Sequence, residues 1–311
     1  MPRTIVVAAA QLGPIARHEG RAPVVARMVE LLREAKARGV GFVTFPEMAL
    51  TTFFPRWHIE DPAEVLSYFE TAMPGPETQP LFDAARAFGI GFYLGYCEMI
   101  PGRTGAHHLG YNTAILVDPT GTIVGKYRKV HVPGNATPDA SLKLQHLEPW
   151  YFDDGNLGFP TFETMGGKLG MLICNDRRWP ESWRMLGLQG AELVCLGYNS
   201  PSLLPDNPKQ NALRKMHHLL PMQSAAYQNG LWIVATAKAG LEGGCHMMGH
   251  SCVIAPSGEV VALSATDGDE LLTYKIDLDA TQEYKRFFDF ATYRRPAAYG
   301  LITRPHSEGQ P

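Results

Sequence analysis

The sequence has little of what marks secreted, membrane and nucleic-acid-binding proteins. Only five of its 311 residues are cysteine, and they form no close Cys-x-x-Cys pair, which argues against a disulfide framework and a structural zinc site. No apolar stretch approaches the roughly 20 residues that a membrane-spanning helix needs. The formal net charge is -3 with no long run of one sign, which argues against nucleic acid and anionic membranes as partners. We therefore expect a globular, cytoplasmic protein with reduced thiols.

Apolar residues alternate along the chain between strand-like runs and helix-like stripes. Buried strands are expected over residues 5–10, 40–45, 91–96, 168–174, 193–196 and 231–235. Helices are expected over residues 23–38, 78–88 and 217–228, with a short one from Glu181. This alternation predicts an α/β fold.

Two similar segments interrupt the alternation. Residues 112–125 and 251–262 each read as strand, Pro-x-Gly turn and strand, which predicts two antiparallel hairpins. They suggest two similar halves, and since no Pro/Gly/Ser-rich linker separates these, we expect one domain over residues 1–311. Residues 287–311 have few periodic apolar positions and several aromatic and arginine residues. That segment is expected to be an arm over the surface or onto a partner subunit, or a frayed tail.

Cys174 stands where a buried strand opens into a polar turn. The apolar run 169–173 precedes it, and a turn with two arginines follows, which is the setting of a nucleophilic thiol. The alternative is a buried small hydrophobe, the usual fate of free cysteine. Within strands that alternative is preferred, as for Cys97, Cys195 and Cys252. Cys245, next to His246 in a glycine-rich loop, would be the rival in a protease-type pair.

Two charged residues follow predicted strands, where α/β enzymes often place their chemistry. Glu47 comes after the buried run 41–46, and Lys129 follows the first hairpin. A carboxylate can take the proton of a thiol, and an ammonium can hold the oxyanion formed when sulfur attacks a carbonyl. Taken singly, Glu47 could be a solvated loop carboxylate and Lys129 a member of a basic cluster. Spacing alone does not bring them together with Cys174.

Three segments, 43–47, 127–133 and 170–176, resemble the Glu, Lys and Cys motifs of the nitrilase superfamily and occur in that family's order. The resemblance runs from the first strand to Leu278. It implies a four-layer αββα sandwich with mixed sheets, which pairs with further subunits as a homodimer or homotetramer. It also implies that neither a metal nor an organic cofactor is used.

Within the superfamily, residues 51–58, 174–181, 217–220 and 227–230 resemble the N-carbamoyl-D-amino-acid amidohydrolases, whereas the loop 135–142 departs from their pattern. The resemblance implies hydrolysis of N-carbamoyl-D-amino acids to D-amino acid, carbon dioxide and ammonia. Two alternatives stay open. One is another amidohydrolase of this fold, acting on N-carbamoyl-β-alanine, N-carbamoylputrescine or aliphatic amides, and the other is a catalytically silent binding protein.

The resemblance also implies further site residues. Glu148 matches the family's second glutamate, and the pocket positions are His131, His146, Asn175, Asn199 and His217. From their chemistry, Arg177 and Arg178 could fork onto a substrate carboxylate, since guanidinium binds carboxylate in bidentate fashion. A structural ion pair with Glu181 or Asp176 is the alternative for either arginine.

The expected mechanism begins with transfer of the Cys174 proton to Glu47 and attack of sulfur on the ureido carbonyl. Lys129 and the backbone N–H after Cys174 would stabilise the oxyanion. Ammonia would leave with a proton from Glu47, and water activated by Glu47, with Glu148, would hydrolyse the carbamoyl thioester. Because free cysteine titrates near pH ~8.5, the ammonium is expected to help keep the sulfur as thiolate.

Overall fold

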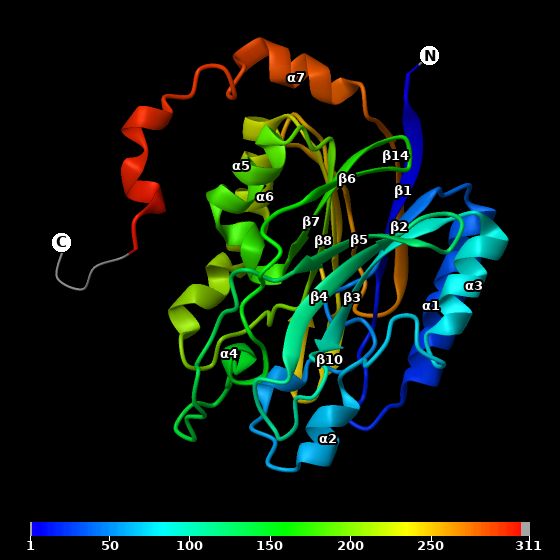
Figure 1. Ribbon diagram of the computed structural model, residues 1–311, viewed down its shortest axis with the longest axis vertical. Helices are drawn as coiled ribbons and strands as arrows, with labels where there is room; N and C mark the ends of the chain where they lie inside the picture. Colours follow the sequence, from blue (N-terminus) through cyan, green and yellow to red (C-terminus); the bar gives the residue numbers. More distant parts are fainter. Residues whose placement is uncertain (1, 306–311) are drawn as a thin grey trace.

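The computed structural model describes residues 2–305, which form two six-stranded mixed sheets (Figure 1). In the first sheet the strand order is β14 (Glu270–Asp277), β1 (Thr4–Gln11), β2 (Phe42–Thr44), β3 (Gly91–Met99), β4 (Gly110–Val117) and β5 (Ile123–Arg128). In the second it is β13 (Val260–Leu263), β12 (Cys252–Ile254), β9 (Trp232–Ala237), β8 (Leu193–Tyr198), β7 (Gly167–Ile173) and β6 (Thr161–Thr164).

The two sheets repeat one plan. Strands β1, β2 and β3 are parallel in the first sheet, as are β7, β8 and β9 in the second. An antiparallel hairpin extends each set on one side, β4–β5 in the first sheet and β12–β13 in the second. An antiparallel strand closes the other side, β14 or β6. The two predicted hairpins and the similarity of the halves are therefore confirmed.

Helices cover the outer face of each sheet. α1 (Arg21–Ala37) and α3 (Gln79–Phe88) pack on the first sheet, with the predicted stripe of α1 turned inward and buried. α5 (Pro180–Leu188) and α6 (Arg214–Asn229) pack on the second. Between the sheets, apolar residues from β2, β3 and β4 meet others from β7 and β8. Each large side chain buried in this way contributes about 1.5–3 kcal/mol, and the expected αββα layering is confirmed.

Short elements gather at the end of the sandwich where the parallel strands finish. They are α2 (Pro62–Ser67), α4 (Glu148–Tyr151), the hairpin β10 (Ala239–Glu242) and β11 (Cys245–Met248), and 3-10 turns at Phe54–Arg56, Cys174–Arg178 and Pro208–Leu213. In Figure 1, α2, α4 and β10 lie together at the lower end of the molecule. Loops at this end are therefore placed to build a site.

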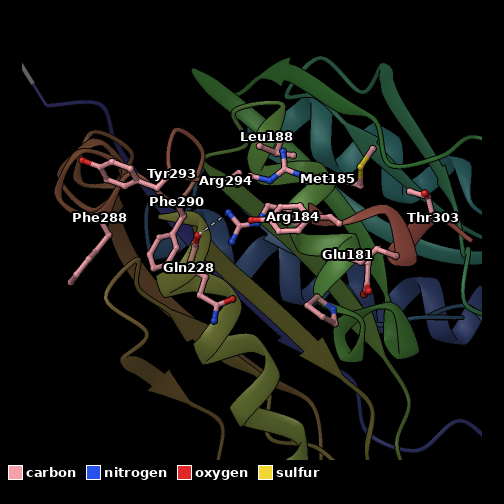
Figure 2. Close-up of a pocket in the computed structure, with 13 residues that line it drawn as sticks. Glu181, Arg184, Met185, Leu188, Gln228, Phe288, Phe290, Tyr293, Arg294 and Thr303 are labelled. Atoms are coloured by element: carbon pink, nitrogen blue, oxygen red, sulfur yellow. Dashed lines mark hydrogen bonds between the residues drawn. The ribbon is translucent and has the colours of Figure 1, made fainter. Parts of the chain in front are cut away.

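The C-terminal segment leaves the sandwich and runs past its α5 side (Figure 1). After α7 (Ala280–Phe288) come two 3-10 turns, Pro296–Ala298 and Gly300–Thr303. The segment and α5 enclose a largely apolar cavity of about 590 Å³, shown in Figure 2. Phe287 and Leu301 on this arm are 78% and 75% exposed. The last part of the predicted arm, 306–311, lies outside the described residues.

Within residues 2–305, none of the helices has the length and apolar character needed to cross a bilayer.

Candidate active site

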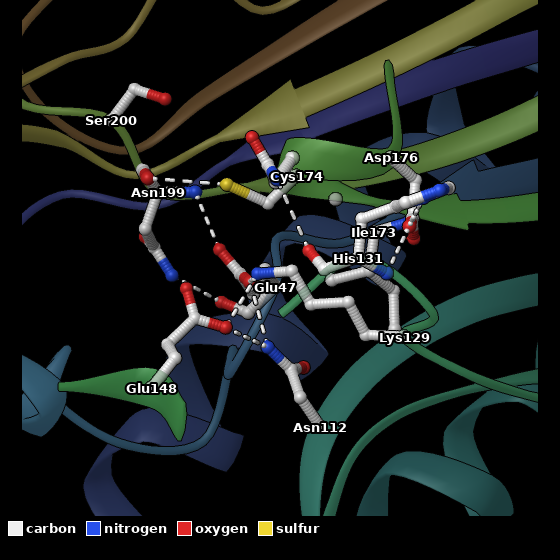
Figure 3. Close-up of polar contacts among 12 residues, drawn as sticks. Glu47, Asn112, Lys129, His131, Glu148, Ile173, Cys174, Asp176, Asn199 and Ser200 are labelled. Carbon is white, nitrogen blue, oxygen red and sulfur yellow. Dashed lines mark hydrogen bonds and ion pairs between the residues drawn. The ribbon is translucent and has the colours of Figure 1, made fainter. Parts of the chain in front are cut away.

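Polar side chains from separate strand ends meet between the sheets (Figure 3). Glu47 follows β2, Lys129 follows β5 and Cys174 follows β7, while Glu148 opens α4. All four are buried. The carboxyl ends of parallel strands share one edge of a sheet, and the two stacked sheets bring their edges together here. The fold thus joins residues that are far apart in the sequence.

Lys129 links the two glutamates. Its Nζ donates to Glu47 Oε1 at 2.8 Å and to Glu148 Oε2 at 2.5 Å. Asn112, in β4, donates its Nδ2 to the same two oxygens at 2.8 and 3.2 Å. Asn112 did not emerge from the sequence, because a single asparagine inside a strand carries no signal of such a role.

The charges of this cluster hold one another. Burial alone would lower the pKa of Lys129, but the carboxylates of Glu148 and Glu47 outweigh it and raise that pKa. Burial likewise opposes ionisation of Glu148, yet Lys129 and the hydrogen bond from His146 lower its pKa to about 2. Lys129 is therefore an ammonium and Glu148 a carboxylate at neutral pH.

Glu47 is fixed by backbone contacts. Its Oε2 accepts the backbone N–H of Asn199 at 2.9 Å, and its carbonyl accepts Asn199 Nδ2 at 2.8 Å. Gly95 in β3 and Gly197 in β8 pinch the Pro46–Glu47 peptide from opposite sheets. A Cβ at Gly95 would lie 2.6 Å from the Pro46 carbonyl oxygen, and one at Gly197 would lie 2.6 Å from the Pro46 carbonyl carbon. Only glycine permits this approach.

Cys174 begins the 3-10 turn instead of ending the strand, because β7 stops at Ile173. Its φ is +47°, a left-handed value that is rare for a residue with a Cβ and is often found at functional sites. Sγ lies 3.4 Å from the carbonyl oxygen of Asn199 and 3.7 Å from Arg177 Nη1.

The prediction of a resting thiolate is wrong. Burial and the neighbouring Glu47 raise the pKa of the Cys174 thiol, and they outweigh the lowering effects of Lys129 and Arg177. The sulfur therefore holds its proton at neutral pH.

Asp176 joins the 3-10 turn that begins at Cys174 to the segment that follows Lys129. Its carboxylate accepts the backbone N–H groups of Ile173 at 3.1 Å and His131 at 2.9 Å, and the hydroxyl of Tyr127 at 2.7 Å. His131 Nδ1 lies 2.8 Å from the same carboxylate. From the sequence alone, Asp176 is expected only as a possible ion-pair partner for an arginine. The available signal was an acidic residue three positions after the strand end, as in helix capping.

The predicted pocket residues lie in different settings. His146 Nε2 is 2.8 Å from Glu148 Oε1 at the rim of the cluster. The ring of His131 stacks on that of Trp179 with centroids 4.8 Å apart, and Asn175 donates its Nδ2 to the His131 carbonyl at 3.2 Å. Over the described part of the chain, no hydrogen bond joins the His217 side chain to the cluster. The next residue on α6, His218, is buried, and its Nε2 lies 3.0 Å from the Tyr198 hydroxyl.

The two arginines of the turn differ. Arg177 is fully buried and donates to the Cys174 carbonyl at 2.7 Å and to Ser200 Oγ at 2.9 Å. Arg178 is exposed, and Arg177 and partial burial lower its pKa to about 10. Among residues 2–305 neither arginine forms an ion pair, so the pairs considered with Glu181 and Asp176 do not form.

Cys245 has no histidine partner in the described structure. The ring of His246 instead contacts Ser202 Oγ at 3.0 Å and Asp267 at 3.2 Å. The other three cysteines are buried, as preferred from the sequence, and burial raises the pKa of Cys195 and Cys252 to about 12. No group of three His, Cys, Asp or Glu side chains that could hold a metal ion occurs in the described range.

Comparison with known proteins agrees with this geometry. The family described as carbon-nitrogen hydrolase matches residues 6–286. A protein named nitrilase from Pyrococcus abyssi is 29% identical over 80% of this chain and 81% of its own length. A protein named N-carbamoylputrescine amidase from Arabidopsis thaliana is 27% identical over 89% of each chain. The crystal structure of a carbon-nitrogen hydrolase from Helicobacter pylori G27 has a TM-score of 0.83 at 25% identity, covering 98% of this chain and 100% of the other. With this match over most of its length, the chain belongs to the carbon-nitrogen hydrolase family, which is part of the nitrilase superfamily.

Proposed function

We propose that the protein is an amidohydrolase that uses Cys174 to cleave a ureido carbon–nitrogen bond in a substrate that also carries a carboxylate. The observation that supports the chemistry is the convergence of Cys174, Glu47 and Lys129 in one buried cluster. The observation that supports the carboxylate is the presence of unpaired arginine side chains beside the cysteine.

The reaction follows from these positions. Glu47 takes the thiol proton, and sulfur attacks the ureido carbonyl while Lys129 and the backbone N–H of Asn175 stabilise the oxyanion. The carbon–nitrogen bond breaks, and ammonia leaves with the proton from Glu47. A carbamoyl thioester remains on Cys174. Glu47, with Glu148 beside it, then activates water to release carbamate, which decays to carbon dioxide and the free amine.

The charge near Cys174 bears on the choice of substrate. Arg178 is exposed, and Arg214 on α6 donates to the Pro201 carbonyl at 2.8 and 3.1 Å. No carboxylate in residues 2–305 pairs with either guanidinium, so their positive charge is free to attract an anion. N-carbamoylputrescine carries an ammonium, which these arginines would repel. A ureido acid carries the complementary charge, and Arg178 can bind its carboxylate.

Among ureido acids, we propose the N-carbamoyl-D-amino acids as the preferred group. Support for this choice comes from residues 174–181, 217–220 and 227–230, which resemble the N-carbamoyl-D-amino-acid amidohydrolases. The positive charge of Arg178 and Arg214 supports it as well. The second candidate is another amidohydrolase of this fold, such as one acting on N-carbamoylputrescine. The named relatives support it better than the D-amino-acid choice, because proteins that are 27% and 28% identical bear the names N-carbamoylputrescine amidase and citrullinase.

Ammonia release from a panel of substrates tests the proposal. The panel contains N-carbamoyl-D-phenylalanine, its L enantiomer, N-carbamoyl-β-alanine, N-carbamoylputrescine and a simple aliphatic amide. We expect the highest kcat/KM for the D-phenylalanine derivative and a low value for N-carbamoylputrescine. Faster turnover of N-carbamoylputrescine than of all three acids would overturn the carboxylate requirement, and preference for the L enantiomer would overturn the D assignment alone.

Replacing Arg178 with glutamine sharpens the same test. Loss of a bidentate contact to carboxylate is expected to raise KM for the ureido acids by roughly 10- to 100-fold, the scale of a charged hydrogen bond. The value for the simple amide should change little. An equal rise for both substrates would mean that Arg178 does not bind the carboxylate.

We also propose that copies of the chain associate through α5 and the C-terminal arm. Apolar residues on this face are unusually exposed, among them Met185 at 47% and Phe287 at 78%, and the face borders the cavity of Figure 2. Sedimentation velocity of the full chain should give a dimer or tetramer. A Met185→Glu variant should shift the distribution toward monomer, and a monomeric wild-type protein would contradict the proposal.

A further inference from the structure

We propose that Arg177 is a catalytic residue that stabilises the Cys174 thiolate, and that it does not bind the substrate carboxylate. This role rests on the proposed function only in taking Cys174 as the nucleophile. It divides the two neighbouring arginines, leaving Arg178 to the substrate and assigning Arg177 to the sulfur.

The position of Arg177 is set by contacts with the nucleophile turn. Nη1 donates to the Cys174 carbonyl at 2.7 Å and lies 3.7 Å from Sγ, within the range of a hydrogen bond to sulfur. Nη2 donates to Ser200 Oγ at 2.9 Å, and the ring of Tyr198 lies under the guanidinium with its centroid 4.8 Å away. The guanidinium is therefore held against the reacting atom from several sides.

Burial distinguishes Arg177 from Arg178, although both border the cavity between α5 and α6. The side chain has no exposed surface, whereas Arg178 next to it is exposed. Its Nη1 and Nη2 groups already donate to protein atoms, and its Nε is buried without a partner in the described structure. A carboxylate clamp needs two free, parallel N–H groups at the surface of the pocket. Arg177 presents no such pair, because its unpartnered Nε is buried.

A count of charges shows why the sulfur needs this guanidinium. With both glutamates ionised, Glu47, Lys129 and Glu148 carry a net charge of -1 by simple addition. When Glu47 takes the thiol proton, the three sum to zero, and the new thiolate has no net positive charge on that side. Arg177, which pairs with no carboxylate in residues 2–305, supplies it at contact distance. In a buried site such a charge acts with little screening.

The pH dependence of thiol alkylation tests this role directly. Iodoacetamide is neutral, so its reaction with Cys174 follows thiolate formation and needs no carboxylate binding. Cys245 is half-buried, whereas the other four cysteines are buried, so the measurement uses a Cys245→Ser background to remove the competing thiol. In Arg177→Gln we expect the midpoint of alkylation to rise by about one pH unit or more, with a roughly tenfold slower reaction at neutral pH. Arg177→Lys, which keeps the charge, should restore part of the shift.

Arg184→Gln is the matched control, since this arginine of α5 donates to Gln228 away from the cluster. It should leave the alkylation profile unchanged. In turnover, Arg177→Gln should lower kcat for a simple amide and for a ureido acid by similar factors.

An unchanged alkylation midpoint in both Arg177 variants, with KM raised for the ureido acid alone, would overturn the proposal in favour of a carboxylate clamp. Circular dichroism and thermal unfolding identify a variant that has lost the fold, in which case the folded Arg177→Lys protein decides the question. If no ureido compound is hydrolysed but the midpoint still shifts, the proposed substrate fails and the role of Arg177 stands.

Discussion

Cys174→Ala is expected to lower kcat for every substrate on the order of 10⁴- to 10⁶-fold, the scale seen when a catalytic nucleophile is removed. The thiol is the only candidate nucleophile of the buried cluster in the described structure, with Sγ 3.4 Å from the Asn199 carbonyl. Because the substitution removes one buried atom, the free energy of unfolding should change by only about 1 kcal/mol. Ammonia release and urea unfolding measure the two effects.

Cys245→Ala is the control for this result. That thiol is half-buried on β11, and the neighbouring histidine is engaged with other side chains. Its removal should leave kcat within about twofold. Full activity of Cys174→Ala would show that hydrolysis does not need this thiol. Inactivation by Cys245→Ala alone would identify Cys245 as the nucleophile.

Lys129→Met should lose both activity and stability. The oxyanion would lose its cation, for which a fall in kcat of about 10²- to 10³-fold is typical. Two buried glutamates would also share one site without a counter-charge, and removing one partner of a buried ion pair costs about 3–5 kcal/mol. The free energy of unfolding from urea titration should fall accordingly. Lys126→Met, which removes a half-exposed partner of Glu98 from β5, the strand that Lys129 follows, should cost less than about 1 kcal/mol.

The contribution of Glu148 to the pH dependence of stability should change sign in Lys129→Met. In the wild type the pKa of Glu148 falls from 4.5 to about 2 on folding, so its contribution is complete above pH 4.5 and is lost as the pH falls toward 2. Without the ammonium, burial raises the carboxyl pKa above the unfolded value. As the pH falls from 7 to 5, the stability deficit of the variant relative to the wild type should therefore shrink. Burial lowers the pKa values of His218 and His250 in both proteins, so their contributions cancel in this difference. A deficit that is equal at both pH values would contradict this account of the cluster.

Much of the fold could be predicted because local patterns determine it. The apolar stripe of α1, the Pro-x-Gly turns of the two hairpins and the apolar run before Cys174 each encode one element. Glu47 and Lys129 stood out because each follows a strand. Their contact at 2.8 Å could not be derived, since it depends on how two sheets stack rather than on spacing within either.

Other features depend on three-dimensional environment. Asn112 and Asp176 acquire their roles from partners distant in sequence. The raised pKa of the Cys174 thiol follows from burial beside Glu47, whereas the sequence displayed only the nearby positive charges. The sequence does not distinguish the two arginines of the turn. In the structure, the tight turn after β7 buries Arg177 and leaves Arg178 exposed.

Gly95 and Gly197 separate the position of Glu47 from the choice of substrate, two properties that enzymes often tune together. The main chain of both sheets contacts the Pro46–Glu47 peptide, so the location of Glu47 depends on the distance between the two sheets. Substitutions in the loop after Lys129 and in the loop beyond Asn199 can reshape substrate choice without moving Glu47. A larger residue at either glycine would instead wedge the layers apart. Diversification within this scaffold is therefore expected at the rim, with the reaction centre carried over intact.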